Sequence, residues 1–156
     1  MPAAALDAVI PALTQELKAL QQVSEALIAE HKALVDVDPG DLEQAILHKN
    51  QLLTELANLR HARETLTGTG SLVQFLDDNA AGATGVDEAR ALIEQLRSLG
   101  KACQQQNQSN GRLIAGLKEN TEGALSVLRA GEAGVTLYGQ DGDRSSDLGS
   151  RILGTA

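Results

Sequence analysis

The chain has 156 residues, a formal net charge of −8 and a hydrophobic fraction of 42%, and Phe75 and Tyr138 are its two aromatic residues. This length suits one domain rather than two. The acidic charge argues against nucleic acid and anionic membrane surfaces as partners, because both would repel the chain. Since Ala and Leu supply most of the apolar residues, we expect helices that pack along narrow seams.

Cysteine usage and hydropathy indicate the compartment. Cys103 is the single cysteine, so no disulfide can form within the chain and nothing favours an oxidising compartment. The chain opens without the cationic and apolar pattern of a secretion signal, and no apolar run approaches the roughly 20 residues of a membrane-spanning helix. We therefore expect a cytoplasmic protein without membrane insertion, in which Cys103 is a small apolar residue on a helix.

A first helix is predicted over residues 3–37, where apolar residues follow one another at steps of four and three. This alternation is typical of a left-handed coiled-coil seam. Pro11 removes one backbone donor, so it should either kink the helix or mark its true start. Ser24 and His31 occupy seam positions. We interpret them as register-setting polar residues or small packing defects, because no Cys, Ser or carboxylate constellation supports a catalytic His31.

A second helix is predicted over residues 39–66. Asp38 can cap its first turn, and Pro39 suits the first helical position. The short link to the first helix implies an antiparallel hairpin. Lys49 and Arg63 fall on the apolar seam two heptads apart. We expect them to bury their stems and extend their charges to solvent, rather than to form a specific anion site.

A short helix is predicted over residues 71–78 and a long one over residues 87–129. The long helix carries an apolar stripe at helical spacing, which the amides Gln106, Asn110 and Asn120 interrupt. The stripe consists of Ala89, Leu92, Leu96, Leu99, Cys103, Leu113, Leu117, Ala124 and Val127. An unbroken helix of this length would reach roughly 60 Å. Each glycine within it costs about 1 kcal/mol relative to Ala, so we expect it to be flexible or ordered by a partner.

From Gly131 onward the composition changes to glycine, serine, aspartate and threonine, with too little apolar area to offset the entropy of ordering. The sequence therefore predicts one helical domain over residues 1–130 and a flexible tail over residues 131–156. The apolar run from Val135 to Tyr138 is either a docking peptide for a partner or a segment that folds back on the bundle. The predicted fold is all-α: an elongated antiparallel helical bundle, made of a coiled-coil-like hairpin and a long C-terminal helix.

Motifs for catalysis or metal binding are missing from the sequence. None of the histidines, His31, His48 and His61, follows a glutamate by three residues as in di-iron bundles. No His-Glu-x-x-His helix, phosphate loop or Gly-x-Ser-x-Gly elbow occurs. We expect no enzymatic activity, no metal and no cofactor. Two hypotheses stay open: a binding protein that offers a helical face and a tail, and a helical-bundle metal-binding or enzymatic protein with unrecognised ligands.

Three segments resemble a known family. Residues 104–111 read QQQNQSNG and belong to the pattern Asn107-x-x-Asn110-Gly111-x-Leu113-Ile114, residues 137–142 read LYGQDG, and residues 49–63 read KNQLLTELANLRHAR. The first resembles the late-helix motif, and the second the tail motif, of flagellar export chaperones of the FlgN type. The third is similar to the family in its basic-Leu-Leu-x-x-Leu-x-x-Leu pattern. The specific part of this likeness lies in the last third of the chain.

The resemblance implies a cytoplasmic, non-enzymatic helical chaperone that binds hook-associated subunits of the hook–filament junction. Such a chaperone prevents premature assembly of these subunits and delivers them to the flagellar type III export apparatus, where its tail contacts the cytoplasmic domain of the export gate. The interrupted stripe and the resemblance together place the subunit contacts at Asn107, Asn110, Leu113, Ile114 and Leu117. The expected gate contacts are Leu137, Tyr138 and Gly139. The sequence assigns no oligomeric state.

Overall fold

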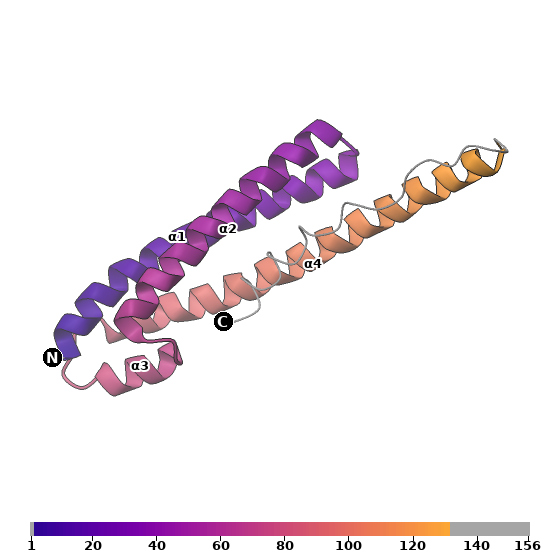
Figure 1. The fold of residues 1–156 in the computed structure, drawn as a ribbon. Coiled ribbons are helices and arrows are strands. Elements are labelled where there is room, and N and C mark those ends of the chain that lie inside the picture. Colours follow the sequence, from indigo (N-terminus) through magenta and orange to yellow (C-terminus); the bar gives the residue numbers. More distant parts are fainter. Residues whose placement is uncertain (1, 132–156) are drawn as a thin grey trace.

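The computed structural model of the chain describes residues 2–131, and within this range it consists of helices without a strand (Figure 1). The helices are α1 (Pro2–Asp36), α2 (Pro39–Thr67), α3 (Leu72–Asn79) and α4 (Val86–Gly131). Their bounds lie within two residues of the predicted ones, and the predicted all-α fold is confirmed. The predicted flexible tail, apart from Gly131, lies outside the described residues.

α1 and α2 form the predicted antiparallel hairpin, because only two residues connect them. The Asp38 carboxylate accepts hydrogen bonds from the backbone N–H groups of Gly40 and Asp41, each at 3.1 Å. These bonds satisfy two of the free donors in the first turn of α2, and Pro39 occupies the start of that turn as predicted. α1 continues through Pro11, so this proline does not mark the start of the helix.

α1 lies at the centre of the bundle, and α2 and α4 pack on different faces of it. Most of the predicted seam of α1 is buried. A second buried set lies beside it, made of Val9, Ala19, Val23 and Ala26. α4 runs parallel to α1, because α2 returns the chain to the end where α1 starts, and α3 and its linkers reverse the chain there before α4 begins (Figure 1). Successive long helices are therefore antiparallel, and the buried residues on both sides of α1 belong to one core.

α4 is continuous over its 46 residues, a length of about 70 Å at the usual helical rise. Its internal glycines do not interrupt it. The first half buries Ala89, Ile93, Leu96 and Cys103 in the core. Over residues 111–130 every residue is exposed or half-buried, because α4 diverges from the α1–α2 hairpin and then continues past its end (Figure 1). We name residues 111–130 the α4 extension.

Gly100 and Gly85 offer a matched pair of glycine substitutions. A Cβ atom on Gly100, within α4, would meet Leu20 Cδ2 at 3.9 Å, which is an ordinary contact. Gly100→Ala should therefore raise the free energy of unfolding by about 1 kcal/mol. Gly85 has a φ of +81°, and a Cβ there would approach Ile10 Cδ1 at 2.7 Å, so Gly85→Ala should lower that free energy. Urea unfolding measures both shifts, and shifts of the same sign would contradict the packing described.

Candidate functional site

A buried polar cluster lies where the α4 extension leaves the bundle, and Asn110 is its centre. Asn110 is fully buried. Its Nδ2 donates to Leu27 O and to Glu30 Oε1, each at 2.9 Å. Its Oδ1 accepts from Gln106 Nε2 at 2.9 Å and lies 3.2 Å from His31 Nδ1. Because a buried amide without partners costs free energy, these contacts fix the register of α4 on α1.

Lys49 extends the buried polar cluster to α2. Its Nζ lies 2.6 Å from Glu30 Oε2 and donates to Asn107 Oδ1 at 3.3 Å. The Glu30 side chain is fully buried. Its contact with Lys49 is a close ion pair whose angles differ from those of a well-directed hydrogen bond. The cluster therefore joins α1, α2 and α4 through charged and amide groups.

A second buried ion pair lies two heptads away, between Glu16 of α1 and Arg63 of α2. The guanidinium Nε and Nη2 donate to the two carboxylate oxygens at 2.6 and 3.3 Å, and Nη1 donates to Thr67 Oγ1 at 3.5 Å. The expectation that Lys49 and Arg63 extend their charges to solvent is therefore wrong. α1 supplies a buried carboxylate opposite each cation. The signal for this arrangement in the sequence is the two-heptad spacing of Glu16 and Glu30, which matches that of the two cations.

The predicted subunit contacts occupy two different environments. Asn107 and Asn110 belong to the buried polar cluster, and Asn110 has no exposed surface. Leu113 and Ile114 are 38% and 37% exposed, and Leu117 is half-buried. The five residues follow one another along α4, but only the three apolar ones lie on the α4 extension. The predicted gate contacts, Leu137, Tyr138 and Gly139, lie outside the described residues.

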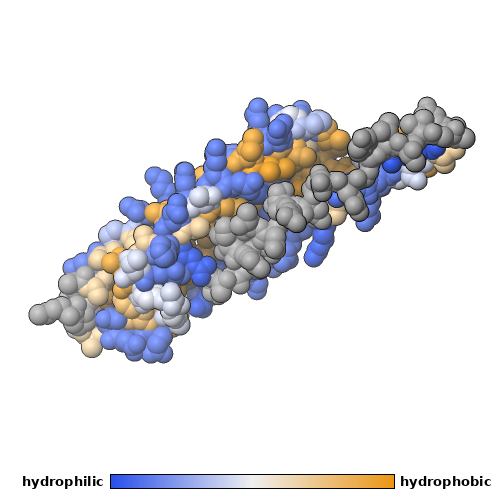
Figure 2. Space-filling model, viewed as in Figure 1, coloured by the Kyte–Doolittle hydropathy of each residue, from blue (hydrophilic) through white to orange (hydrophobic). Residues whose placement is uncertain are grey.

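Large apolar side chains are also exposed elsewhere around the point where α4 leaves the hairpin. On the hairpin they are Ile28, Val35, Val37 and Leu47, and farther along the α4 extension they are Leu125, Val127 and Leu128. Figure 2 shows apolar surface gathered over the far end of the hairpin. Contiguous exposed apolar surface is typical of a protein-binding face. The sequence did not single out these four residues, because Ile28, Val35 and Leu47 lie off the seams of their helices and Val37 lies in the connection between α1 and α2.

The alternative hypothesis of a metal-binding protein finds no ligand set in the part of the chain that the structure describes. Within residues 2–131, no three His, Cys, Asp or Glu side chains gather as ligands for a metal ion. His48 and His61 are exposed on α2, and His31 contacts the amide of Asn110. In the same range, no helix combines the length and the apolar character that crossing a membrane requires.

Cys103 is buried between α4 and α1, where its thiol lies 4.0 Å from Leu20 O. Burial raises the pKa of this thiol, and a hydrogen bond with Ser24 lowers the pKa by less. The unfolded chain ionises first, near the usual thiol pKa of about 8.5. The raised pKa therefore stabilises the fold below that pH, and this contribution is lost as pH rises through the folded pKa.

We therefore expect the free energy of unfolding to fall as pH is raised above about 8.5, and Cys103→Ala to remove the thiol's share of that fall. Urea unfolding of both proteins from about pH 7 to about pH 10 measures the effect. The same slope in wild type and variant would contradict the raised thiol pKa. Because the thiol faces the core, Cys103→Ala should also change partner binding by less than about 1 kcal/mol.

Comparison with known proteins identifies a family. The family model described as FlgN protein matches residues 1–146. No curated protein and no solved structure matches the chain. The matched range covers the four helices described here and both predicted contact regions, residues 107–117 and 137–139.

Proposed function

The chain belongs to the FlgN family of flagellar chaperones, and from this premise we propose that it binds hook-associated subunits of the hook–filament junction. It keeps these subunits unassembled in the cytoplasm and delivers them to the flagellar type III export apparatus. The observation that carries the proposal is the α4 extension, a helix that leaves its bundle with apolar side chains exposed. Family membership supports the flagellar role, and the exposed helix supports the mode of binding.

The α4 extension suits the binding of another helix. Leu113, Ile114 and Leu117 continue the stripe that packs on α1 in the first half of α4. Over these residues α4 diverges from the hairpin and then passes its end, so α1 does not cover this part of the stripe (Figure 1). An amphipathic helix of a subunit can take the place of α1 there and bury the exposed apolar area. A subunit that assembles through terminal helices would then be unable to pair with another subunit.

Asn107 and Asn110 have a positioning role in this proposal, rather than direct contact with the subunit. Their contacts with Lys49 and Glu30 hold the base of the α4 extension against α2 and α1. An extension that is anchored at its base loses less conformational freedom when a partner binds. The buried polar cluster therefore supports the affinity of the neighbouring apolar residues.

Binding to purified junction subunits tests this proposal. Each hook–filament junction subunit encoded in the same genome is mixed with the chain and examined by size-exclusion chromatography and calorimetry. We expect a stable complex with at least one of them and slower self-association of the bound subunit. A filament subunit from the same genome is the control, and it should not form a comparable complex. Absence of a complex with every junction subunit would refute the proposal.

We further propose that Leu137, Tyr138 and Gly139 contact the cytoplasmic domain of the export gate. An aromatic anchor on a short peptide offers a large contact area for a small loss of entropy, and glycine beside it lets the backbone turn sharply. Tyr138→Ala should lower gate affinity and swimming motility, while subunit affinity and melting temperature stay nearly unchanged. Weakened subunit binding with normal gate binding would refute the assignment. A lower melting temperature would indicate a tail that folds back on the bundle.

A further inference from the structure

The three long helices leave one corner of a four-helix bundle open. α1 packs against both α2 and α4, whereas α2 and α4 make no comparable contact with each other. Figure 1 shows α4 diverging from the hairpin with distance from α3. In a four-helix bundle a further helix would lie diagonally opposite α1, between α2 and α4.

A groove of about 380 Å³ occupies this corner at the α3 end. Its floor is apolar and includes Leu20 of α1, Leu56 of α2 and Leu96 of α4, each at most 9% exposed. Ala57 and Gly100 add little bulk to its walls, and residues 69–71 of the α2–α3 linker close one end. The groove can therefore bury apolar side chains of a partner without rearrangement of the core.

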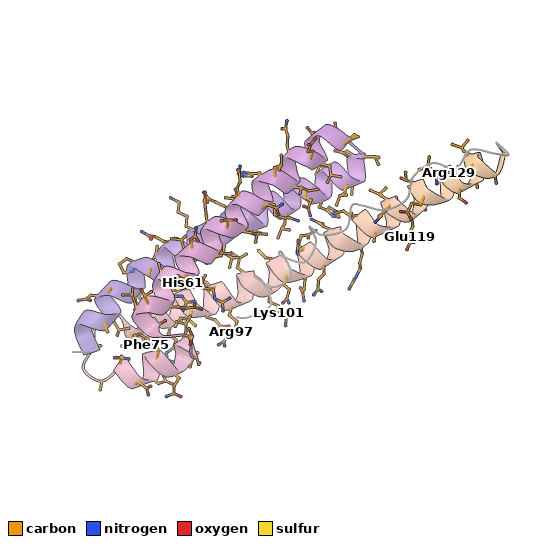
Figure 3. All side chains as sticks on the ribbon, viewed as in Figure 1. His61, Phe75, Arg97, Lys101, Glu119 and Arg129 are labelled. Carbon is orange, nitrogen blue, oxygen red and sulfur yellow. The ribbon has the colours of Figure 1, made fainter. Side chains whose placement is uncertain are left out.

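Cations border the groove, although the whole chain carries a net charge of −8. Arg60 of α2 and Arg97 of α4 line it, and Lys101 follows Arg97 by one helical turn (Figure 3). Glu64 pairs with Arg60 at 3.1 Å. The Arg97 side chain is 58% exposed and meets Glu94 only at 3.8 Å, so its charge is available to a partner. Glu16 and Arg63 also line the groove, and they pair with each other at 2.6 Å. The excess of positive charge therefore comes from Arg97 and Lys101, and it favours acidic side chains on a partner that docks there.

We propose that this groove binds one amphipathic helix of a second protein, with acidic residues along the flanks of its apolar stripe, and that the complex completes a four-helix bundle. The inference rests on the proposed function for the identity of the partner as a flagellar subunit. It adds a docking site to the α4 extension. Because both sites lie along α4, one extended subunit segment can follow the helix from one to the other.

Two synthetic helical peptides of about 20 residues are the probes. Both carry a leucine stripe, one with Glu and the other with Lys along its flanks. The full-length chain should bind the Glu-flanked peptide more tightly, although its net charge of −8 repels that peptide as a whole. Ala57→Leu fills the groove and should weaken binding about tenfold or more. Arg97→Glu combined with Lys101→Glu should reverse the preference between the two peptides.

Two variants outside the groove are matched controls. Ala62→Leu enlarges an exposed alanine of α2, and Lys18→Glu reverses an exposed charge of α1. Both should leave peptide binding within about twofold of the wild type. Thermal melting accompanies every variant, and Ala57→Met, with a more adaptable side chain, replaces Ala57→Leu if that variant melts early. Preference of the wild type for the Lys-flanked peptide, or unchanged binding by the groove-filling variant, would overturn the inference.

The same variants are then tested with the junction subunits. A subunit that binds wild type and Ala57→Leu equally would overturn the groove as a docking site and leave the proposed function intact. Absence of subunit binding, together with loss of Glu-flanked peptide binding in Ala57→Leu, would refute the proposed function and support the groove. Light scattering tests a second copy of the chain as the occupant. If the wild type is a dimer and Ala57→Leu is a monomer, a second copy occupies the groove and the inference is overturned. Hydrogen exchange tests the chain's own tail as the occupant. If residues 132–156 are protected in the wild type and lose this protection in Ala57→Leu, the tail occupies the groove and the inference is overturned.

Discussion

Arg63→Met is expected to lower the free energy of unfolding by about 3–5 kcal/mol, the range for removal of one partner from a buried ion pair. Glu16 is 7% exposed, and its carboxylate oxygens lie 2.6 and 3.3 Å from the Arg63 guanidinium. Without the arginine, this carboxylate stays buried between α1 and α2 and has no opposite charge beside it. Urea denaturation at neutral pH measures the loss.

The double variant Glu16→Met/Arg63→Met separates the charge effect from the packing effect. Replacement of a whole buried pair by apolar side chains of similar volume is often neutral or stabilising, so the double variant should regain most of the lost stability. Arg90→Met is the exposed control, because the side chains of Arg90 and Asp77 are 55% and 52% exposed and such pairs contribute little. A loss for Arg63→Met as small as that for Arg90→Met would contradict the burial of the Glu16–Arg63 pair.

The helices were predictable from the sequence because local chemistry sets their bounds. Asp38 and Pro39 start α2 through contacts within a few residues. Ser71 starts α3 by accepting a hydrogen bond from the Gln74 N–H at 3.4 Å. The apolar spacing of each long helix repeats over many turns, so it identifies a buried face without knowledge of the partner helix. None of these signals depends on residues far apart in the chain.

The second buried face of α1 and the buried ion pairs depend on such distant residues. Glu16 meets Arg63, and Glu30 meets Lys49 and Asn110, only after three helices have assembled. Charged side chains in general lie at the surface, so solvent exposure was the reasonable expectation for each of these charges taken alone. The opposite charge on the facing helix overrides that expectation, because it compensates for part of the loss of solvation.

The candidate site was predictable to a similar extent. The stripe on α4 and the family resemblance together identified Leu113, Ile114 and Leu117, which lie on the α4 extension. They also assigned Asn110 to the binding surface, although this amide is enclosed by α1 in the structure. A stripe has the same spacing whether a neighbouring helix covers it or not. The cover ends where α4 diverges from α1 (Figure 1), and the spacing of a stripe carries no signal of that divergence.

Leu113→Asp combined with Leu117→Asp is expected to weaken subunit binding by several kcal/mol, since two charges would enter a contact that excludes water. Asn110 is the last buried residue of α4 before the extension begins. The core therefore stays intact in this variant, and its melting temperature should change little. Calorimetric titration with a junction subunit and thermal melting, both on the same preparation, measure the two quantities.

A matched control places the same charges on the other side of the α4 extension. Ala115 and Ser126 are exposed, and helical spacing directs both of them away from Leu113 and Leu117. Ala115→Asp combined with Ser126→Asp should bind subunits normally. If both double variants weaken subunit binding equally, the loss comes from the added negative charge and not from the apolar stripe. If Leu113→Asp/Leu117→Asp melts normally and binds the subunit with unchanged affinity, the α4 extension is not part of the binding surface. The exposed apolar end of the hairpin would then be the face to test, because it presents the other large apolar side chains at the point where α4 leaves the bundle.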